Sequence, residues 1–170
     1  MKRVVVVGSP GSGKSTFSKK LGNKAGLPIV HLDYYHLQSE HNYRLDTESW
    51  NSKVIGLIKP DKWIVDGNYG ATFPERFKVA DTIIFFDIPR RVCVYRILKR
   101  YFYYQNRKRD EMPDDWEEKL DPEFLKYVWH FNKRSKPKIL HQIKNNRNKN
   151  VIIFKKSKEA EDYLNTIKQA

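Results

Sequence analysis

The chain alternates short runs of apolar residues with longer segments in which apolar residues recur every three or four positions. Continuous apolar runs bounded by turn residues are typical of buried strands, and they occur at residues 3–7, 29–32, 63–67, 82–87 and 151–154. Helical spacing predicts helices at residues 14–25, 47–58, 89–103 and 122–131, with a resumed pattern at 139–143 and a last helix from residue 157. This alternation predicts an α/β fold in which crossover helices join parallel strands.

Two of the expected helix boundaries depend on single residues. Pro137 has no backbone N–H to donate, so we expect it to break or kink the helical pattern that begins at residue 122. Ser157 is placed to cap the last helix by accepting a backbone hydrogen bond. A full capping box is not expected, because Ala160 stands where the box needs an acid or an amide.

The segment from about residue 105 to residue 121 is polar, charged and poorly periodic. It lies between two expected helices, so we interpret it as a mobile lid within an insertion at about residues 101–125. A chain of 170 residues is enough for one domain with a full core and too short for two ordinary domains. We therefore expect a single domain over residues 1–170.

Charge and cysteine content narrow the class of protein. The chain has 33 Lys and Arg against 20 Asp and Glu, and its net charge of +13 suits polyanionic ligands such as nucleotides, nucleic acid or an anionic surface. Cys93 is the only cysteine, so an internal disulfide is excluded. The sequence has neither a leader of signal-peptide type nor an apolar stretch of about 20 residues, so we expect a cytoplasmic protein with no membrane partner.

The first apolar run leads directly into a glycine-rich segment with the spacing G-x-x-x-x-G-K-[ST], the sequence form of a phosphate-binding P-loop. Its glycines let several backbone N–H groups point at one anion, and the following helix directs its positive end to the same place. Lys14 is expected to contact the β- and γ-phosphates of ATP, and Ser15 to bind Mg²⁺. The residues expected to bind ATP here are Gly8, Ser9, Pro10, Gly11, Ser12, Gly13, Lys14, Ser15 and Thr16.

Carboxylates end three of the expected strands, and each has a functional and a structural interpretation. Asp66 is placed to hold Mg²⁺ through a water molecule beside the P-loop strand. Asp87 competes for this role, but it lies close to Pro89 and can instead cap the helix there. Asp33 ends the second strand, where it can orient or deprotonate an acceptor hydroxyl or can be a turn residue.

The P-loop, the Asp-Gly pair at 66–67 and the segment 82–100, with DIP at 87–89 and RILKR at 96–100, resemble the adenylate-kinase-like P-loop kinases. More closely, HLD at 31–33, WIVDGNY at 63–69 and DIPRR at 87–91 resemble the topology modulation (FlaR-type) proteins within that group. The resemblance covers nearly the whole chain. It implies a three-layer fold with five parallel strands in the order 2-3-1-4-5, helices on both faces, and a helical lid that closes over ATP.

The resemblance also assigns roles to two arginines. Arg96 and Arg100 match the pair with which adenylate-kinase relatives contact nucleotide and phosphate at the base of the lid. Their spacing of four places both guanidinium groups on one helix face, where they can stabilise charge on a transferring phosphoryl group. A solvated basic helix face is the alternative. Weaker candidates for contacting phosphate are Arg107, Arg109 and Arg134.

The chain departs from the adenylate kinases at one informative place. Those enzymes follow the Asp-Gly of the third strand with a Pro-Arg pair whose arginine grips the acceptor monophosphate, whereas this chain has Asn68, Tyr69 and Gly70 there. The departure weakens the case for a nucleoside monophosphate acceptor, unless Arg44 or Arg76 supplies the missing cation. Asn68 and Tyr69 are candidates for hydrogen bonds to an acceptor, and Tyr69 is nearly as well explained by packing at the end of the sheet.

Two classes of function remain open from the sequence. The first is an ATP- and Mg²⁺-dependent phosphotransferase that moves the γ-phosphate to a nucleoside, nucleotide or hydroxylated metabolite. Its catalytic residues would be Lys14, Asp33, Arg96 and Arg100. The alternative is an ATP-regulated nucleic-acid-binding protein affecting DNA topology, which the charge allows. The lysines are spread along the chain rather than gathered in one stripe, and no helix-turn-helix or zinc-finger spacing occurs, which favours the phosphotransferase.

Overall fold

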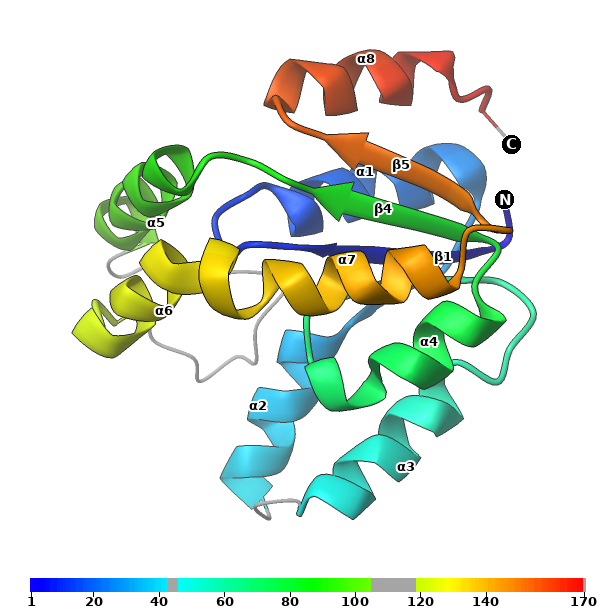
Figure 1. The fold of residues 1–170 in the computed structure, drawn as a ribbon, viewed down its shortest axis with the longest axis horizontal. Helices are drawn as coiled ribbons and strands as arrows, with labels where there is room; N and C mark the ends of the chain where they lie inside the picture. Colours follow the sequence, from blue (N-terminus) through cyan, green and yellow to red (C-terminus); the bar gives the residue numbers. More distant parts are fainter. Residues whose placement is uncertain (43–45, 105–118, 170) are drawn as a thin grey trace.

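A five-stranded parallel sheet forms the centre of the protein, with strand order β2-β3-β1-β4-β5. Figure 1 shows three of these strands, β1, β4 and β5, side by side. The computed structural model describes residues 1–42, 46–104 and 119–169. The strands are β1 (Arg3–Gly8), β2 (Ile29–His31), β3 (Trp63–Asp66), β4 (Thr82–Phe86) and β5 (Asn150–Phe154). The apolar runs of β1, β3 and β4 are buried on both faces, as parallel strands covered by helices require. The expected sheet and its strand order are confirmed.

Helices cover both faces of this sheet and make a three-layer structure. The helices are α1 (Lys14–Ala25), α2 (Leu32–Asn42), α3 (Thr47–Leu57), α4 (Phe73–Val79), α5 (Arg90–Tyr104), α6 (Pro122–Arg134), α7 (Lys136–Asn145) and α8 (Ser157–Thr166), and a 3₁₀ turn, η1, spans Gly70–Thr72. Val5 and Val7 of β1 belong to a core shared with α3, α4 and α7. Val4 and Val6 point to the opposite face and belong to a core shared with α1, α5 and α8. Because side chains alternate along a strand, β1 contributes to the hydrophobic core on both faces of the sheet.

The strand register brings the carboxyl ends of four strands together at one edge of the sheet. Asp66, the last residue of β3, is paired with Val6 of β1 and with His31 of β2. On the other side of β1, Gly8 is paired with Phe86 of β4. Parallel strands place ligand sites at this edge, so the P-loop, Asp66 and His31 lie where a ligand is expected.

The structure differs from the predicted elements in three places. The second strand ends at His31, and α2 begins at Leu32, so Asp33 lies in the first turn of a helix rather than at a strand end. The helix α4 and the turn η1 were not expected from the sequence. The predicted capping role of Ser157 is wrong, because α8 begins at that residue and Lys156 is its N-cap. The expectation of no capping box is wrong as well, because Glu159, three residues after Lys156, accepts a hydrogen bond from the backbone N–H of Lys156.

Other boundary predictions are confirmed. The helical pattern from residue 122 is divided into α6 and α7, and Pro137 lies in the first turn of α7, where its missing N–H costs nothing. The expected lid falls largely on residues 105–118, which lie outside the described residues. Within the described ranges, no helix has the length and apolar character that crossing a membrane requires.

Candidate active site

The segment between β1 and α1 has the conformation expected of a P-loop. Gly8, Gly11 and Gly13 have φ angles of 149°, 75° and 97°, which side-chain-bearing residues rarely adopt. Space is restricted as well, because a Cβ on Gly11 would lie 2.4 Å from the carbonyl oxygen of Cys93. Gly13 caps α1 without a side-chain hydrogen bond, so the first N–H groups of this helix remain for an anion.

Lys14 begins α1 and extends back over the loop. Its Nζ donates to the carbonyl oxygen of Ser9 at 3.2 Å. Lys14, Ser15 and Thr16 all line a cavity at this edge of the sheet. The loop, the lysine and the hydroxyl groups are thus gathered as the sequence motif predicts.

Asp66 is a buried carboxylate beside the P-loop, with 4% of the residue exposed. Its Oδ2 lies 3.2 Å from Nδ1 of His31. Burial raises the pKa of Asp66, but the hydrogen bond with His31, the charge of Lys14 and the Ser15 hydroxyl outweigh it, so the pKa lies below its ordinary value. Its Oδ1 is buried and has no hydrogen-bond partner among the described residues. A charged, unsatisfied oxygen next to Ser15 fits a hydrated Mg²⁺ ion.

Asp87, the competing carboxylate, is already paired. Its two carboxylate oxygens lie 2.7 and 2.8 Å from Nζ of Lys136, the first residue of α7. The pair joins the end of β4 to the helix that covers one face of the sheet. Because a lysine already neutralises Asp87, the geometry favours Asp66 over Asp87 as the metal-binding carboxylate.

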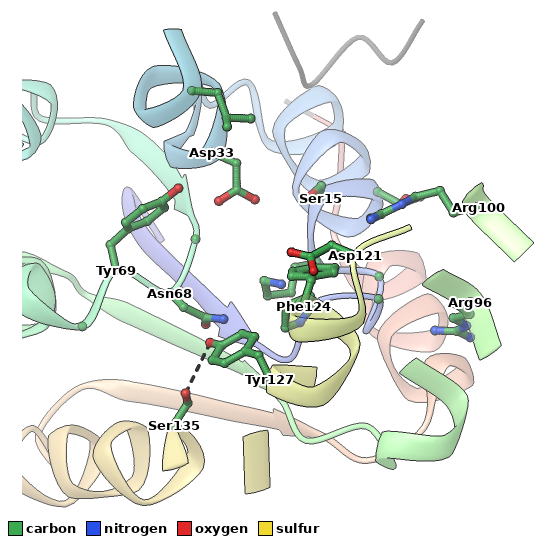
Figure 2. A pocket seen from close by; sticks show the side chains of 18 of the residues that line it. Ser15, Asp33, Asn68, Tyr69, Arg96, Arg100, Asp121, Phe124, Tyr127 and Ser135 are labelled. Carbon is green, nitrogen blue, oxygen red and sulfur yellow. Dashed lines mark hydrogen bonds between the residues drawn. The ribbon is translucent and has the colours of Figure 1, made fainter. Parts of the chain in front are cut away.

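A cavity of about 1020 Å³ lies at the carboxyl edge of the sheet. The P-loop and the start of α1 form one wall, and α2 with the turn after β3 forms another. Figure 2 shows the carboxylate of Asp33 facing into this space, and Arg100 extending from α5 toward Ser15. The cavity therefore brings together Lys14, Asp33 and Arg100, which come from three separate helices.

The far side of the cavity is formed by residues that the sequence did not single out as site residues. Phe124 and Tyr127 of α6 form part of this side (Figure 2), and the hydroxyl groups of Tyr127 and Ser135 are 3.3 Å apart. Lys119 and Lys138 also line the cavity. No local motif marks these positions, because they reach the cavity only when α6 and α7 pack over the sheet.

Arg96 occupies a different position from Arg100, although the two share one helix. Its guanidinium donates to the carbonyl oxygen of Ser12 at 3.3 Å and to Oγ of Ser157 at 2.7 Å. It thus bridges the P-loop and the start of α8, and it borders both the large cavity and a smaller one of about 260 Å³. The hydroxyl that was expected to cap α8 instead accepts a hydrogen bond from this arginine.

The suggestion that Arg76 supplies a cation to an acceptor is wrong. This residue is completely buried in α4, and its guanidinium donates to the carbonyl oxygens of Gly67, Asn68 and Tyr69. Its Nε donates to the hydroxyl of Thr72. All of these acceptors belong to the turn that follows β3, and Arg76 itself is not among the residues that line the cavity.

The side chain of Asn68 is hydrogen-bonded to the first glycine of the P-loop. Its amide donates to the carbonyl oxygen of Gly8 at 2.8 Å and accepts from the Gly8 N–H at 3.1 Å. Asn68 and Tyr69 both line the cavity, and the ring of Tyr69 packs against Trp50 and His36 with centroid distances of 4.9 and 5.0 Å. Tyr69 therefore packs at the end of the sheet and also borders the cavity, and its hydrogen bond to an acceptor stays a prediction.

The remaining arginine candidates do not add to the described site. Arg134 lies exposed at the end of α6 and is not among the residues that line the cavity. Arg44, Arg107 and Arg109 fall outside the described residues. The cations that the described cavity contains are Lys14, Arg96, Arg100, Lys119 and Lys138.

Comparison with known proteins supports the same fold. No family profile matches the chain. A shikimate kinase from Parabacteroides distasonis is 54% identical over 35 residues, which is 21% of this chain and 20% of the relative. An adenylate kinase from Lachnospira eligens is 29% identical over 80 residues, which is 46% of this chain and 35% of the relative. The matches thus span about a third or less of these curated relatives.

Solved structures match over nearly the whole chain. A shikimate kinase from Acinetobacter baumannii in complex with shikimate has a TM-score of 0.63 at 14% identity, covering 98% of this chain and 90% of that one. A shikimate kinase from Bacteroides thetaiotaomicron has a TM-score of 0.60 at 14% identity, covering 96% and 94%. The chain therefore has a P-loop kinase fold like that of shikimate and adenylate kinases. The finer resemblance to topology modulation proteins stays a prediction.

Proposed function

We propose that this protein transfers the γ-phosphate of ATP to a hydroxyl group of a small acceptor. The observation that carries the proposal is the shared cavity in which the Asp33 carboxylate faces the P-loop while Arg100 extends toward Ser15. Such an arrangement provides an anion-binding loop, a cation and a group that accepts a hydroxyl proton around one space. The local match to two kinases and the shared fold support this class of reaction.

In this proposal the donor lies on the P-loop side of the cavity. The N–H groups at the start of α1 and Lys14 hold the β- and γ-phosphates. Ser15 and, through water, Asp66 would hold Mg²⁺, which when bound neutralises charge on the phosphates. Arg96 borders the P-loop and would contact the nucleotide after exchanging its bond to Ser157.

The acceptor lies on the side formed by α2 and the turn after β3. Asp33 orients the acceptor hydroxyl and takes its proton as the hydroxyl oxygen bonds to the γ-phosphorus. The bond from that phosphorus to the bridging oxygen breaks, and ADP leaves. Leu37, Tyr69, Phe73 and Tyr127 give this side an aromatic and apolar lining. Arg76 is unavailable to an acceptor phosphate, so a nucleoside or another hydroxylated ring compound fits this side better than a nucleoside monophosphate.

The test is ADP formation from Mg·ATP across a panel of nucleosides, nucleoside monophosphates and hydroxylated metabolites that includes shikimate. One acceptor should stimulate ADP formation, and Lys14→Ala and Asp33→Asn should each reduce the stimulated rate by about 10²- to 10⁴-fold. Asp61→Asn is the matched control, because this exposed carboxylate precedes β3 at the opposite edge of the sheet. A rate that no acceptor stimulates would contradict the proposal. Salt-dependent DNA retention that survives Lys14→Ala would instead favour a nucleic-acid-binding protein.

A further inference from the structure

Arg76 is unusual because a fully buried guanidinium is held mainly by main-chain oxygens rather than by a carboxylate. Its three donor nitrogens reach the carbonyls of Gly67, Asn68 and Tyr69 at 2.9 to 3.1 Å and the Thr72 hydroxyl at 3.0 Å. Burial lowers the pKa of Arg76 to about 9, against the opposing effect of Asp66, so the group is still charged near neutral pH. A buried charge is costly, and this dense set of hydrogen bonds helps to offset the cost.

The bonds of Arg76 fix the backbone of three successive residues at the point where β3 ends. Gly67 has a φ of 142°, and a Cβ there would lie 2.9 Å from that of Leu32, so the chain turns in a confined space. Arg76 holds the carbonyl of Asn68 at 2.9 Å, and the side chain of Asn68 reaches Gly8 at the end of β1. The arginine therefore sets the position from which Asn68 acts.

Asn68 connects this turn to the start of the P-loop. Its side chain forms two hydrogen bonds with one residue, donating to the Gly8 carbonyl at 2.8 Å and accepting from the Gly8 N–H at 3.1 Å. On its other side, Gly8 has no room, because a Cβ would lie 2.6 Å from the carbonyl oxygen of Phe86. The first glycine of the loop is thus fixed from both neighbouring strands.

We propose that Asn68 and Arg76 are positioning residues for nucleotide binding: Asn68 fixes the backbone of Gly8 at the base of the P-loop, and Arg76 fixes Asn68. Arg76 is fully buried, and the side-chain amide of Asn68, which borders the cavity, is hydrogen-bonded to Gly8. The inference rests on the proposed binding of ATP at the P-loop, but it does not require that an acceptor be known. In this inference, the turn after β3 fixes the backbone conformation of the ATP-binding loop. The same turn carries Tyr69, which lines the cavity.

The readout is the dissociation constant of Mg·ATP, measured by titration calorimetry well below the melting temperature of each variant. Asn68→Ala removes two hydrogen bonds to Gly8 and should weaken Mg·ATP binding by about tenfold. Arg76→Lys keeps the charge but lacks the planar set of donors, so it should weaken binding by a similar factor. Phe77→Leu is the matched control, because it loosens α4 next to Arg76 without touching the turn, and it should lower the melting temperature only.

The double variant Asn68→Ala/Arg76→Lys separates positioning from a purely structural role. If Arg76 acts through Asn68, the double variant should bind Mg·ATP no more weakly than Asn68→Ala alone. Additive losses, or an Asn68→Ala variant that binds like the wild type, would overturn the proposal. If Arg76→Lys fails to fold, the comparison of Asn68→Ala with the wild type decides alone.

The same titration separates this inference from the proposed function. A wild-type chain that binds Mg·ATP but phosphorylates no acceptor would contradict the proposed function. The Mg·ATP affinities of the variants would still decide whether Asn68 and Arg76 are positioning residues. A wild-type chain that does not bind Mg·ATP would overturn both.

Discussion

The choice between Asp66 and Asp87 as the metal-binding carboxylate can be decided by two matched substitutions. Asp66→Asn removes a negative charge next to Ser15 while keeping the size of the side chain and an oxygen that accepts a hydrogen bond from His31. Asp87→Asn removes a charge of the same sign at the end of the neighbouring strand β4. Both variants should fold, so their difference reports on the metal site rather than on stability.

The structure gives the magnitude expected for each variant. Oδ1 of Asp66 is buried and has no partner among the described residues, so a water molecule bound to Mg²⁺ would donate one hydrogen bond to it. Hydrogen bonds to charged groups contribute about 1.5–3 kcal/mol, which corresponds to about a 10- to 150-fold change in a binding constant. Asp87→Asn instead weakens an ion pair with Lys136 whose side chains are 19% and 27% exposed, which should cost about 1 kcal/mol of stability or less.

The assay is the Mg²⁺ concentration that half-saturates ATP binding, measured at constant ATP with a fluorescent nucleotide. Asp66→Asn should raise this concentration by at least tenfold, whereas Asp87→Asn should leave it unchanged and lower the melting temperature by a few degrees. Equal Mg²⁺ requirements in the wild type and Asp66→Asn would refute the assignment. A raised requirement in Asp87→Asn alone would transfer the role to Asp87.

The stability of the wild type and of Asp66→Asn at acid pH gives a second check on Asp66. Because its pKa is lowered in the folded state, ionised Asp66 stabilises the fold above the ordinary value of 3.8. That contribution is lost as the pH falls from 3.8 through the lowered pKa. The wild type should therefore lose stability more steeply than Asp66→Asn below pH 3.8. Parallel stability curves would show that the interactions of Asp66 do not favour its charged form.

Two glycine substitutions test the close packing around α1. Gly11→Ala should abolish Mg·ATP binding in a folded protein, because the new Cβ would lie 2.4 Å from the Cys93 carbonyl at a φ of 75°; binding at the wild-type level would show that the loop is not held as described. Gly22→Ala should lower the free energy of unfolding by about 1–3 kcal/mol, although alanine favours helices, because its Cβ would lie 2.7 Å from Ile29 and 2.9 Å from the Leu27 carbonyl. Chemical denaturation measures the latter, and a more stable variant would contradict the packing argument.

The sheet and the P-loop were predictable because their signals are local in the sequence. The four valines of β1 and the apolar run of β4 mark strands buried on both faces, and the glycine spacing from Gly8 to Gly13 marks a turn of fixed shape. The break at Pro137 is equally local, since a proline without an N–H can only begin a new helix there. Each of these elements is determined by residues next to one another in the chain.

The errors concern residues whose roles depend on distant partners. Ser157 looks like a cap, but its hydroxyl accepts a hydrogen bond from Arg96, which is 61 positions away. Arg76 looks like a free cation until α4 folds back on the turn after β3. Asp33 was expected at a strand end, because α2 has almost no segregation of apolar residues to one face and so lacks the usual helical signal.

The same distinction explains why the donor side of the cavity is easier to assign than the acceptor side. The P-loop lies directly after β1, next to the point in the sheet where the chain crosses from β3 to β4, and ligands of α/β proteins bind at such places. Its partners for phosphate are mostly backbone groups, which any chain with this fold can supply. The acceptor side is built from side chains of α2, α6 and α7 together with Tyr69, and no local motif marks these positions as site residues. A likeness at 14% identity shows the fold alone, so the acceptor of the proposed reaction must be found from the side chains that face Asp33.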